Sequence, residues 1–336
     1  MANVRQIASN LGVSVATVSR ALNNKPNVRV DTRERIRAEA IRLGYNPAYL
    51  RSSTQTIGLA YTGDQGRVDY GGFDAALIDG VLKGVDEQRF DVTIISLHRD
   101  KLPSESYRTF FARKGVSGVV LRTFQHSRLV CEAIAEEGVP SIVVADRFDD
   151  ERVSYIGTES RLESKHAVEH LIHLGHRRIA LGVHAVTDTD HQDRSRGYLD
   201  ALSAHGIESD PALTVNIVAD MQGGGSAIRY FMSLPDPPTA VYFTDPLATI
   251  GALQFCHQNE IKVPQQLSIV GFDDSEVRYH SFPPFTAVCQ DARALGFEAA
   301  LWLTRYISGV EREPIRRMLP TSFDIQQTTA APAKTR

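Results

Sequence analysis

The first 45 residues carry apolar positions at the spacing of short amphipathic helices. Two helices are predicted there, because the periodic pattern stops once and then resumes. The apolar positions are Val4, Ile7, Ala8 and Leu11 in the first helix and Val15, Val18, Ala21 and Leu22 in the second. A third helix is predicted over residues 31–43, with Asp31 as its cap and Gly44 after its end.

The break between the first two helices is short enough to predict a helix-turn-helix. Gly12 suits the positive φ that ends a helix, and Ser14 can cap the second helix by accepting a hydrogen bond from the N–H of Ala16 or Thr17. A turn of this length sets two helices at a steep angle. In DNA-binding proteins the second helix of such a pair lies in a groove of the duplex. An ordinary helical hairpin is the alternative.

From residue 57 onward, short apolar runs alternate with stretches of helical period. Strands are predicted at 57–61, 92–96, 118–121, 141–145, 178–181, 214–218, 240–243 and 268–270. Helices are predicted at about 73–88, 104–113, 127–136, 160–173, 193–205, 223–233 and 248–259. Alternating strands and helices predict an α/β fold of parallel sheets flanked by helices, with ligands bound beyond the carboxyl ends of the strands.

The charge is divided unevenly along the chain. The 336 residues contain 37 Lys and Arg against 40 Asp and Glu, for a formal charge of −3. Residues 1–51 hold nine basic and three acidic residues, or +6, so the remainder carries −9. A basic headpiece on an acidic body is typical of a protein that touches a polyanion with one end only.

The three cysteines are widely spaced and form no C-x-x-C motif, which favours a reducing cytoplasm over a disulfide framework. We expect a cytoplasmic protein with no membrane partner, since the start lacks the pattern of a leader and no apolar stretch approaches 18 residues. We expect no enzyme, because the nucleophile-elbow, dinucleotide-binding and P-loop motifs are all missing from the sequence.

Two further features of the sequence could form a metal site or an anion site. Four histidines spaced along residues 166–176 share helical spacing, but no acidic ligand recurs with them, so no metal or other cofactor is expected. The run Gly223-Gly224-Gly225 could hold an anion on its N–H groups, although a flexible turn is the favoured reading.

Residues 4–23 read V-x-x-I-A-x-x-x-G-V-S-x-x-T-V-S-R-x-L-N, and this pattern closely resembles the DNA-binding headpiece of the LacI/GalR family of bacterial transcriptional regulators. Arg20 is the strongest candidate for a bidentate contact to guanine. We expect DNA contacts from Val4, Ser14, Val15, Ala16, Thr17, Ser19, Arg20, Asn23 and Arg29.

The body resembles the same family at the stretches G-V-S-G-V-V-L (115–121), H-L-I-H-L-G-H-R-R-I-A (170–180), R-S-R-G-Y (194–198) and S-I-V-G-F-D-D (268–274). The resemblance implies two lobes like those of periplasmic sugar-binding proteins, joined by three crossovers with a ligand in the cleft. The lobes would span about 57–155 with 285–315, and 156–284 with the last strand. The predicted domains are a headpiece (1–46), a short linker (47–56), the two-lobed body (57–327) and a disordered tail (328–336).

The linker departs from the family pattern. Relatives carry a hinge helix with an A-R-x-L stretch whose leucine enters the minor groove, whereas this linker is several residues shorter. Leu50 and Arg51 stand at the place of the hinge, and a plain spacer is the alternative.

The positions that match the family's effector site are Phe73, Asp146, Arg194, Asp245 and Gln290. The stretch around Asp245 is one residue longer than in relatives, and each aspartate could instead cap a helix. The resemblance implies a regulator, expected to be a repressor, that binds a palindromic operator as a homodimer under the control of a small effector, for which a sugar is expected. The alternatives are a purine effector, or a receptor or enzyme on the same lobes that does not bind DNA.

Overall fold

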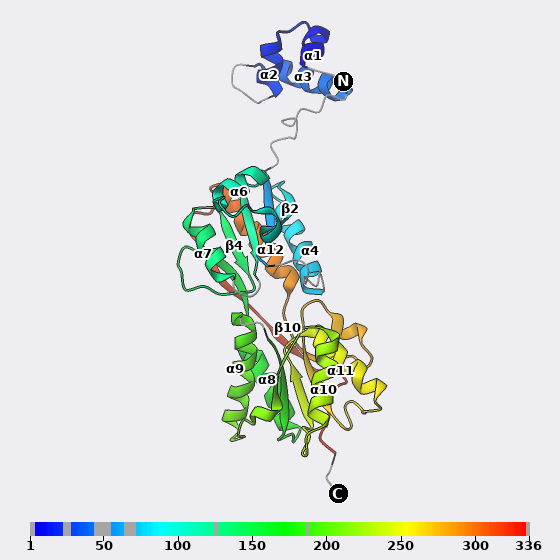
Figure 1. The fold of residues 1–336 in the computed structure, drawn as a ribbon. Helices are drawn as coiled ribbons and strands as arrows, with labels where there is room; N and C mark the ends of the chain where they lie inside the picture. The colour runs from blue at the N-terminus through cyan, green and yellow to red at the C-terminus, as the bar shows by residue number, and fades with distance from the viewer. Residues whose placement is uncertain are drawn as a thin grey trace. The chain divides into compact units, whose positions relative to one another are not determined.

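The computed structural model describes residues 4–22, 28–43, 55–63, 72–123, 127–185 and 188–333 (Figure 1). The chain divides into two units, Met1–Gln55 and Thr56–Arg336. The first is the headpiece and the second is the body, and each is described by itself.

The headpiece contains three helices, α1 (Val4–Leu11), α2 (Val15–Leu22) and α3 (Val30–Arg42). Gly12 between α1 and α2 has a φ of +65°, and the N–H of Thr17 donates to Ser14 Oγ at 3.0 Å, so both features predicted for the turn are confirmed. Helix α3 begins one residue earlier than expected, which places Asp31 in its first turn rather than at the cap. The buried apolar core is Ile7, Ala8, Val18, Ala21, Leu22, Ile36 and Ala40.

The body contains two six-stranded sheets, one in each lobe. The first has strand order β11-β5-β4-β3-β1-β2, with every neighbouring pair parallel. Its strands are β1 (Thr56–Tyr61), β2 (Asp91–Ser96), β3 (Gly118–Arg122), β4 (Ser141–Val144), β5 (Ser154–Glu159) and β11 (Arg316–Pro320). Its helices are α4 (Gly72–Asp86), α5 (Leu97–Asp100), α6 (Tyr107–Lys114), α7 (Arg128–Glu136) and α12 (Ala292–Ile307).

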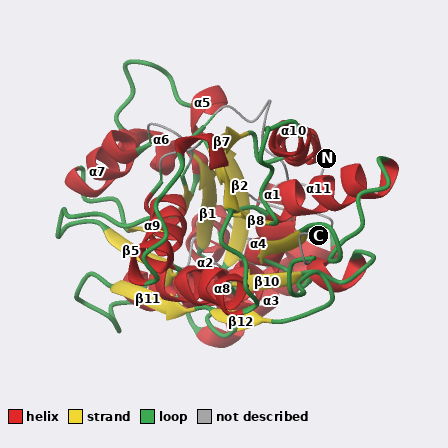
Figure 2. Ribbon diagram, turned by 90° about the horizontal axis from the view of Figure 1, so that it is seen from below, coloured by secondary structure: helices red, strands yellow, loops and turns green. Residues whose placement is uncertain are grey.

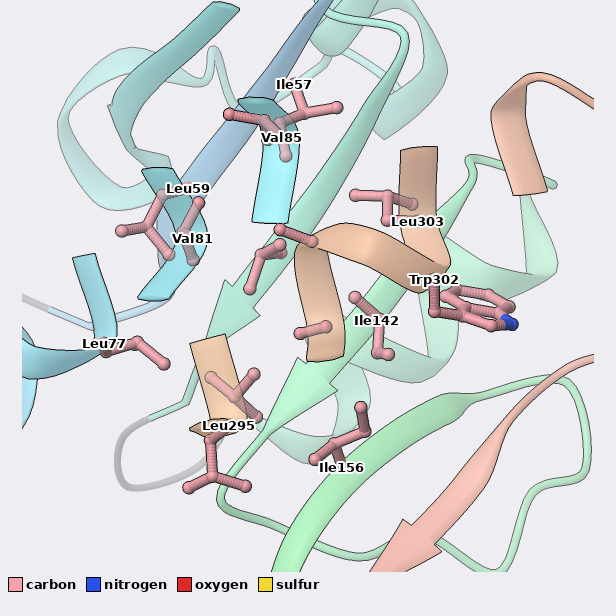
Figure 3. Close-up of a cluster of buried hydrophobic side chains, with 14 of the residues drawn as sticks. Ile57, Leu59, Leu77, Val81, Val85, Ile142, Ile156, Leu295, Trp302 and Leu303 are labelled. Atoms are coloured by element: carbon pink, nitrogen blue, oxygen red, sulfur yellow. The ribbon is translucent and has the colours of Figure 1, made fainter. Parts of the chain in front are cut away.

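Helices α4 and α12 pack on one face of this sheet, where their apolar side chains form a core with the strands (Figure 3). The two helices approach closely because glycines line their contact: a Cβ added at Gly80 would lie 2.0 Å from the carbonyl oxygen of Arg293. Phe110 and Phe111 of α6 and Ile134 of α7 belong to the core on the opposite face. The sheet is therefore covered on both sides, as the run of apolar strands predicts.

The second sheet has strand order β12-β10-β9-β8-β6-β7 and is parallel except for the β10–β12 pair. Its strands are β6 (Ile179–His184), β7 (Thr214–Ile217), β8 (Ala240–Phe243), β9 (Ser268–Asp273), β10 (Thr286–Cys289) and β12 (Ser322–Asp324). Its helices are α8 (Arg161–His173), α9 (Thr189–Ala204), α10 (Met221–Met232) and α11 (Pro246–Gln258), with 3₁₀ turns η2 (Pro211–Leu213) and η3 (Val277–His280). Figure 2 shows helices around the strands of the body.

The chain passes between the lobes three times, after β5, after β10 and after β11, as the resemblance implies. Three boundaries differ from the expectation. Strands β5 and β11 lie wholly in the first sheet, beyond the expected ends at 155 and 315. Strand β10 belongs to the second sheet although its residues were expected in the first lobe. Register explains the difference at β10, because Thr286 pairs with Val270 of β9 in a parallel ladder.

The triple-glycine run lies inside α10, so the expectation of a flexible turn is wrong. A Cβ at Gly224 would lie 1.8 Å from the carbonyl oxygen of Ala248, which shows that the glycines allow α10 to pack directly on α11. The anion-binding reading also fails at Gly223, because its N–H already donates to the N-cap residue Asp220, at 2.6 Å.

The predicted disorder of the C-terminal tail is wrong for residues 328–333, whereas 334–336 lie outside the described residues. Thr328 is fully buried, and its Oγ1 both donates to the carbonyl oxygen of Ile269 and accepts from the N–H of Thr286. His176 Nε2 lies 2.8 Å from the carbonyl oxygen of Ala330, and its Nδ1 lies 2.8 Å from Thr239 Oγ1. Buried hydrogen bonds therefore hold this segment on the second lobe.

No helix in the described part of the chain combines the length and hydropathy needed to cross a membrane.

Candidate functional site

Helix α2 of the headpiece turns one face inward and exposes the other. Val18, Ala21 and Leu22 are buried, whereas Val15, Ala16, Ser19 and Arg20 are exposed and Thr17 is partly exposed. The N-terminal half of α2 thus presents the side chains that we expect to meet DNA. Val4 is partly exposed, and Ser14 and Arg29 are exposed. Asn23, Leu50 and Arg51, and with them the hinge prediction, lie outside the described residues.

In the body, Asp146 and Gln290 lie where the two lobes meet. Asp146 follows β4 and is 5% exposed, and its Oδ1 accepts a hydrogen bond from Thr189 Oγ1, at 2.8 Å, at the start of α9 in the other lobe. Next to it, Arg147 Nη2 donates to Asp193 Oδ2 at 2.5 Å. This loop of the first lobe is therefore joined to the first turns of α9.

Gln290 stands at the second crossover and links three segments. Its Oε1 accepts from Thr158 Oγ1 of β5 at 2.8 Å, and its Nε2 donates to Asp274 Oδ1, after β9, at 2.5 Å. The amide is 7% exposed, so both of its hydrogen bonds are shielded from water.

Arg194 of α9 is 4% exposed and points into the second lobe. Its Nη1 donates to the carbonyl oxygen of Thr244 at 2.8 Å, and its guanidinium lies 3.5 Å from the centroid of the Phe272 ring. Within the described ranges, no carboxylate lies within 4.0 Å of this guanidinium, and its Nε has no hydrogen-bond partner. The guanidinium is thus fixed by packing, by the Thr244 carbonyl and by a 3.5 Å contact of Nη1 with His191 Nε2, with Nε left over as a donor.

Asp245 and Phe73 have other partners in this structure. Asp245 is the N-cap of α11 and accepts from the N–H of Ala248 at 2.9 Å, which is the alternative role considered for it. Phe73, in the first turn of α4, lies beneath the guanidinium of Arg122 at 4.4 Å. Arg122 Nε in turn donates to Asp74 Oδ1 at 3.2 Å.

Sequence reasoning missed Asp190 and Asp274. Asp190 lies four residues before Arg194 on α9 and is 2% exposed. Burial is the largest influence on its pKa and raises it to about 8, against the opposing effect of Arg194. Burial likewise raises the pKa of Asp274 to about 6. The signal that could have found Asp190 is Asp188, which caps α9 by accepting from the N–H of His191, so the helix begins at Thr189 rather than near 193.

His184 ends β6 beside this cluster, and its ring lies 4.8 Å from that of His191. Burial lowers the pKa of His184 to about 4, which leaves its imidazole neutral at pH 7. In the described part of the chain, its Nδ1 has no hydrogen-bond partner. His191 Nδ1 lies 2.7 Å from Asp188 Oδ1, so Asp188 has a partner.

Both units of the chain match known protein families. Residues 3–48 match the model described as bacterial regulatory proteins, lacI family, and residues 168–329 match a periplasmic binding protein-like domain. The chain therefore carries a LacI-family DNA-binding domain and a periplasmic-binding-protein-like domain, and its homologues are LacI-family regulators. It is a DNA-binding transcriptional regulator, and its two-lobed body has the fold that the sequence predicts.

LacI-family relatives match over nearly the whole chain. The HTH-type transcriptional regulator CelR of Thermobifida fusca is 28% identical over 332 residues, covering 97% of each chain. The HTH-type transcriptional repressor CytR of Escherichia coli K12 is 28% identical over 338 residues, covering 98% of this chain and 97% of CytR.

Solved structures show the same architecture. The CelR–cellobiose complex is 28% identical with a TM-score of 0.72, covering 98% of this chain and 100% of that one. The Lac repressor dimer bound to operator has a TM-score of 0.79 at 22% identity, covering 98% and 99% of the two chains, and this likeness bears on the fold alone.

Proposed function

We propose that this LacI-family chain is a repressor that binds a palindromic operator as a homodimer and whose DNA affinity changes when a sugar binds between its lobes. It acts in the cytoplasm, where its operator is, and binds its effector without chemical turnover. The observation that carries the DNA-binding part is the exposed N-terminal half of α2, above a core that fixes its orientation.

Several observations support the remaining parts. CytR is named a repressor, and the CelR structure is a complex with cellobiose. In this chain Arg194, Asp146 and Gln290 carry the charged and amide groups that suit vicinal hydroxyls. A single headpiece contacts few bases, so two-fold pairing on a palindrome gives the required specificity.

The contacts between the lobes suggest how an effector acts. Arg147–Asp193 and Asp146–Thr189 join the first lobe to the start of α9, the helix that also carries Arg194. An effector held by Arg194 changes the relative stability of the lobe arrangements only as far as it binds one of them better. The population shift then alters the fit of the two headpieces to the operator.

The first experiment tests DNA binding. We expect selection from random duplexes to return a palindrome, and the affinity for it to fall steeply with salt, by about 0.9 in log K per phosphate contact for each unit of log salt concentration. Arg20→Ala, which removes the expected guanine contact, is measured beside the wild type and should bind the operator more weakly. Binding without a palindromic preference and without salt dependence would contradict the proposal and favour a receptor that does not bind DNA.

The second experiment tests the effector. Melting temperatures are measured with pentoses, hexoses, disaccharides, sugar phosphates and purines, for the wild type and for Arg194→Ala. A ligand at a hundredfold excess over its dissociation constant stabilises the folded state by about 2.7 kcal/mol. A sugar that stabilises the wild type alone supports the proposal, whereas stabilisation by purines alone replaces the sugar with a purine.

A further inference from the structure

The region around α9 contains buried polar atoms that have no partner. Asp190 Oδ1 and Arg194 Nε are both inaccessible to solvent, and no hydrogen-bond partner for either lies in the described part of the body. A buried polar atom left unpaired costs about 1–3 kcal/mol. An acceptor and a donor one turn apart on the same helix face are therefore suited to a ligand that both donates and accepts hydrogen bonds.

The charges around Arg194 indicate which kind of hydrogen-bond donor would suit Asp190. Asp190, Asp245 and Asp274 all have raised pKa values because of burial, and Arg194 is the strongest opposing influence at Asp190 and Asp274, whereas the N–H of Ala248 and His191 oppose the rise more strongly at Asp245. Asp190 and Asp274 thus share the Arg194 guanidinium. Asp245 is compensated in part by the N-terminus of α11 and the N–H of Ala248.

The neighbouring titratable groups do not supply further positive charge to Asp190 and Asp274. Asp146 accepts from Thr189, Asp193 is bound by Arg147, and Asp188 has His191 as its partner, so these groups are already paired. His184 is neutral at pH 7 because its pKa is lowered to about 4. Positive charge is therefore in deficit at Asp190 and Asp274.

Asp190 also reaches the first lobe. Its Oδ2 lies 3.5 Å from Thr158 Oγ1, which donates to Gln290, and Gln290 donates to Asp274. A chain of polar contacts thus connects Asp190 to Asp274 across the crossover, and Asp274 is partly exposed at the far end of it. A group that binds Asp190 consequently acts on both lobes and on the crossover between them.

We propose that the effector is a sugar carrying a protonated amino group, with the ammonium bound by Asp190 and neighbouring hydroxyls bound by Arg194. This inference rests on the proposed function and narrows its ligand. Burial keeps Asp190 protonated at pH 7 without a ligand, and an ammonium stabilises its ionised carboxylate through both charge and hydrogen bonds, whereas a neutral hydroxyl supplies hydrogen bonds alone.

The experiment compares amino sugars with their hydroxyl counterparts on the full chain at pH 7, by calorimetry and by melting temperature. The pairs are glucosamine with glucose, galactosamine with galactose, mannosamine with mannose, and the β-1,4-linked glucosamine disaccharide with cellobiose. N-acetylglucosamine removes the charge but keeps the nitrogen. We expect at least one amine to bind ten times more tightly than its hydroxyl partner, and the acetylated sugar to lose that gain.

Two variants test whether Asp190 binds the ammonium. Asp190→Asn should weaken the amine at least tenfold and weaken its hydroxyl counterpart by a much smaller factor. Asp200→Asn, the same substitution at an exposed residue of α9 that pairs with Arg161, should leave the amine affinity unchanged. If Asp190→Asn does not fold by circular dichroism, Asp274→Asn, at the other end of the polar chain, takes its place with the same expectation.

The outcomes separate this inference from the proposed function. Operator binding by the wild type, released by a neutral sugar as well as by its amine, keeps the proposed function and overturns the amino-sugar effector. Full amine affinity in Asp190→Asn, or no binding by any of the amines, also overturns it. Failure to bind any palindromic operator instead contradicts the proposed function, whatever the sugars do.

Discussion

Helices α2 and α9 each carry an arginine that we expect to bind a ligand, and the two arginines have opposite surroundings. Arg20 of α2 is exposed, so water satisfies its guanidinium until DNA arrives. Arg194 of α9 is 4% exposed, lies over Phe272 and opposes the rise in pKa that burial causes at Asp190 and Asp274. An exposed ligand-binding arginine therefore contributes little to the free energy of unfolding. A buried one contributes to it directly, because its charge acts on the buried carboxyls around it.

The largest difference between the two helices should appear on removing the buried arginine. Arg194→Ala removes the cation that most opposes the burial of Asp274, whose pKa of about 6 leaves it ionised at pH 7, and it also removes the contacts with Phe272 and the Thr244 carbonyl. Leaving a buried charge without its cation typically costs about 3–5 kcal/mol. We expect a large fall in the free energy of unfolding of the body at pH 7, measured by urea denaturation. The loss should shrink at pH 4, where Asp274 is protonated, and an equal loss at both pH values would contradict this account.

Arg20→Ala is the matching change in the headpiece. It should reduce operator affinity by roughly 1–3 kcal/mol, or about 5-fold to 150-fold, and leave the melting temperature unchanged. Fluorescence anisotropy on the selected operator measures the affinity. Arg42→Ala, which removes an equal charge from α3, is the control and should have the smaller effect. A shifted melting temperature in Arg20→Ala would show that the exposed arginine also supports the fold.

Loss of the cap at the start of α2 should have an intermediate effect that is confined to the headpiece. Ser14→Ala removes the acceptor for the N–H of Thr17 and should destabilise the headpiece by about 1 kcal/mol. Faster amide exchange in residues 4–43 of the full chain would report it. Ser14→Asn keeps a capping side chain and should restore the wild-type rate, with exchange in the body unchanged throughout.

The smallest expected effect is a gain from Asp190→Asn. The folded-state pKa of Asp190, about 8, lies above its ordinary value of 3.8, so the folded protein holds this proton more tightly than the unfolded chain does. Its contribution to stability is complete below about pH 4 and is lost as the pH rises toward 8. We expect Asp190→Asn to melt at a higher temperature than the wild type at pH 8, and at the same temperature as the wild type at pH 4. A lower melting temperature at pH 8 would contradict the charge deficit.

Local signals explain how much of this could be read from the sequence. Gly12, Ser14 and the buried positions of α2 follow from spacing and capping alone, because all their partners lie within a few residues. The strand–helix alternation also predicts the parallel sheets and their flanking helices, whereas the two lobes follow from the family resemblance. Helix α12 lacks a clear period, because it packs on α4 as well as on the sheet and is apolar around much of its surface.

The site between the lobes depends on partners that are far apart in the chain. Thr158 and Gln290 are 132 residues apart, and Thr158 sits in β5, whose short pattern gives no strand signal. The charges that act on Asp190 come from side chains on several helices and loops, so no single sequence motif predicts its raised pKa. The buried tail gives no local signal for the same reason, since Thr328 contacts Thr286, 42 residues away, only once the second lobe has folded.

The final strands have a consequence for how this protein is made. Strand β11 belongs to the first sheet and β12 to the second, and Thr321 alone separates them. Both lobes therefore wait for the last residues to leave the ribosome before their sheets are complete, although residues 1–55 can fold long before. A nascent body spends most of its synthesis with two open sheet edges, so premature termination near residue 315 should yield an aggregation-prone chain in which neither lobe is finished.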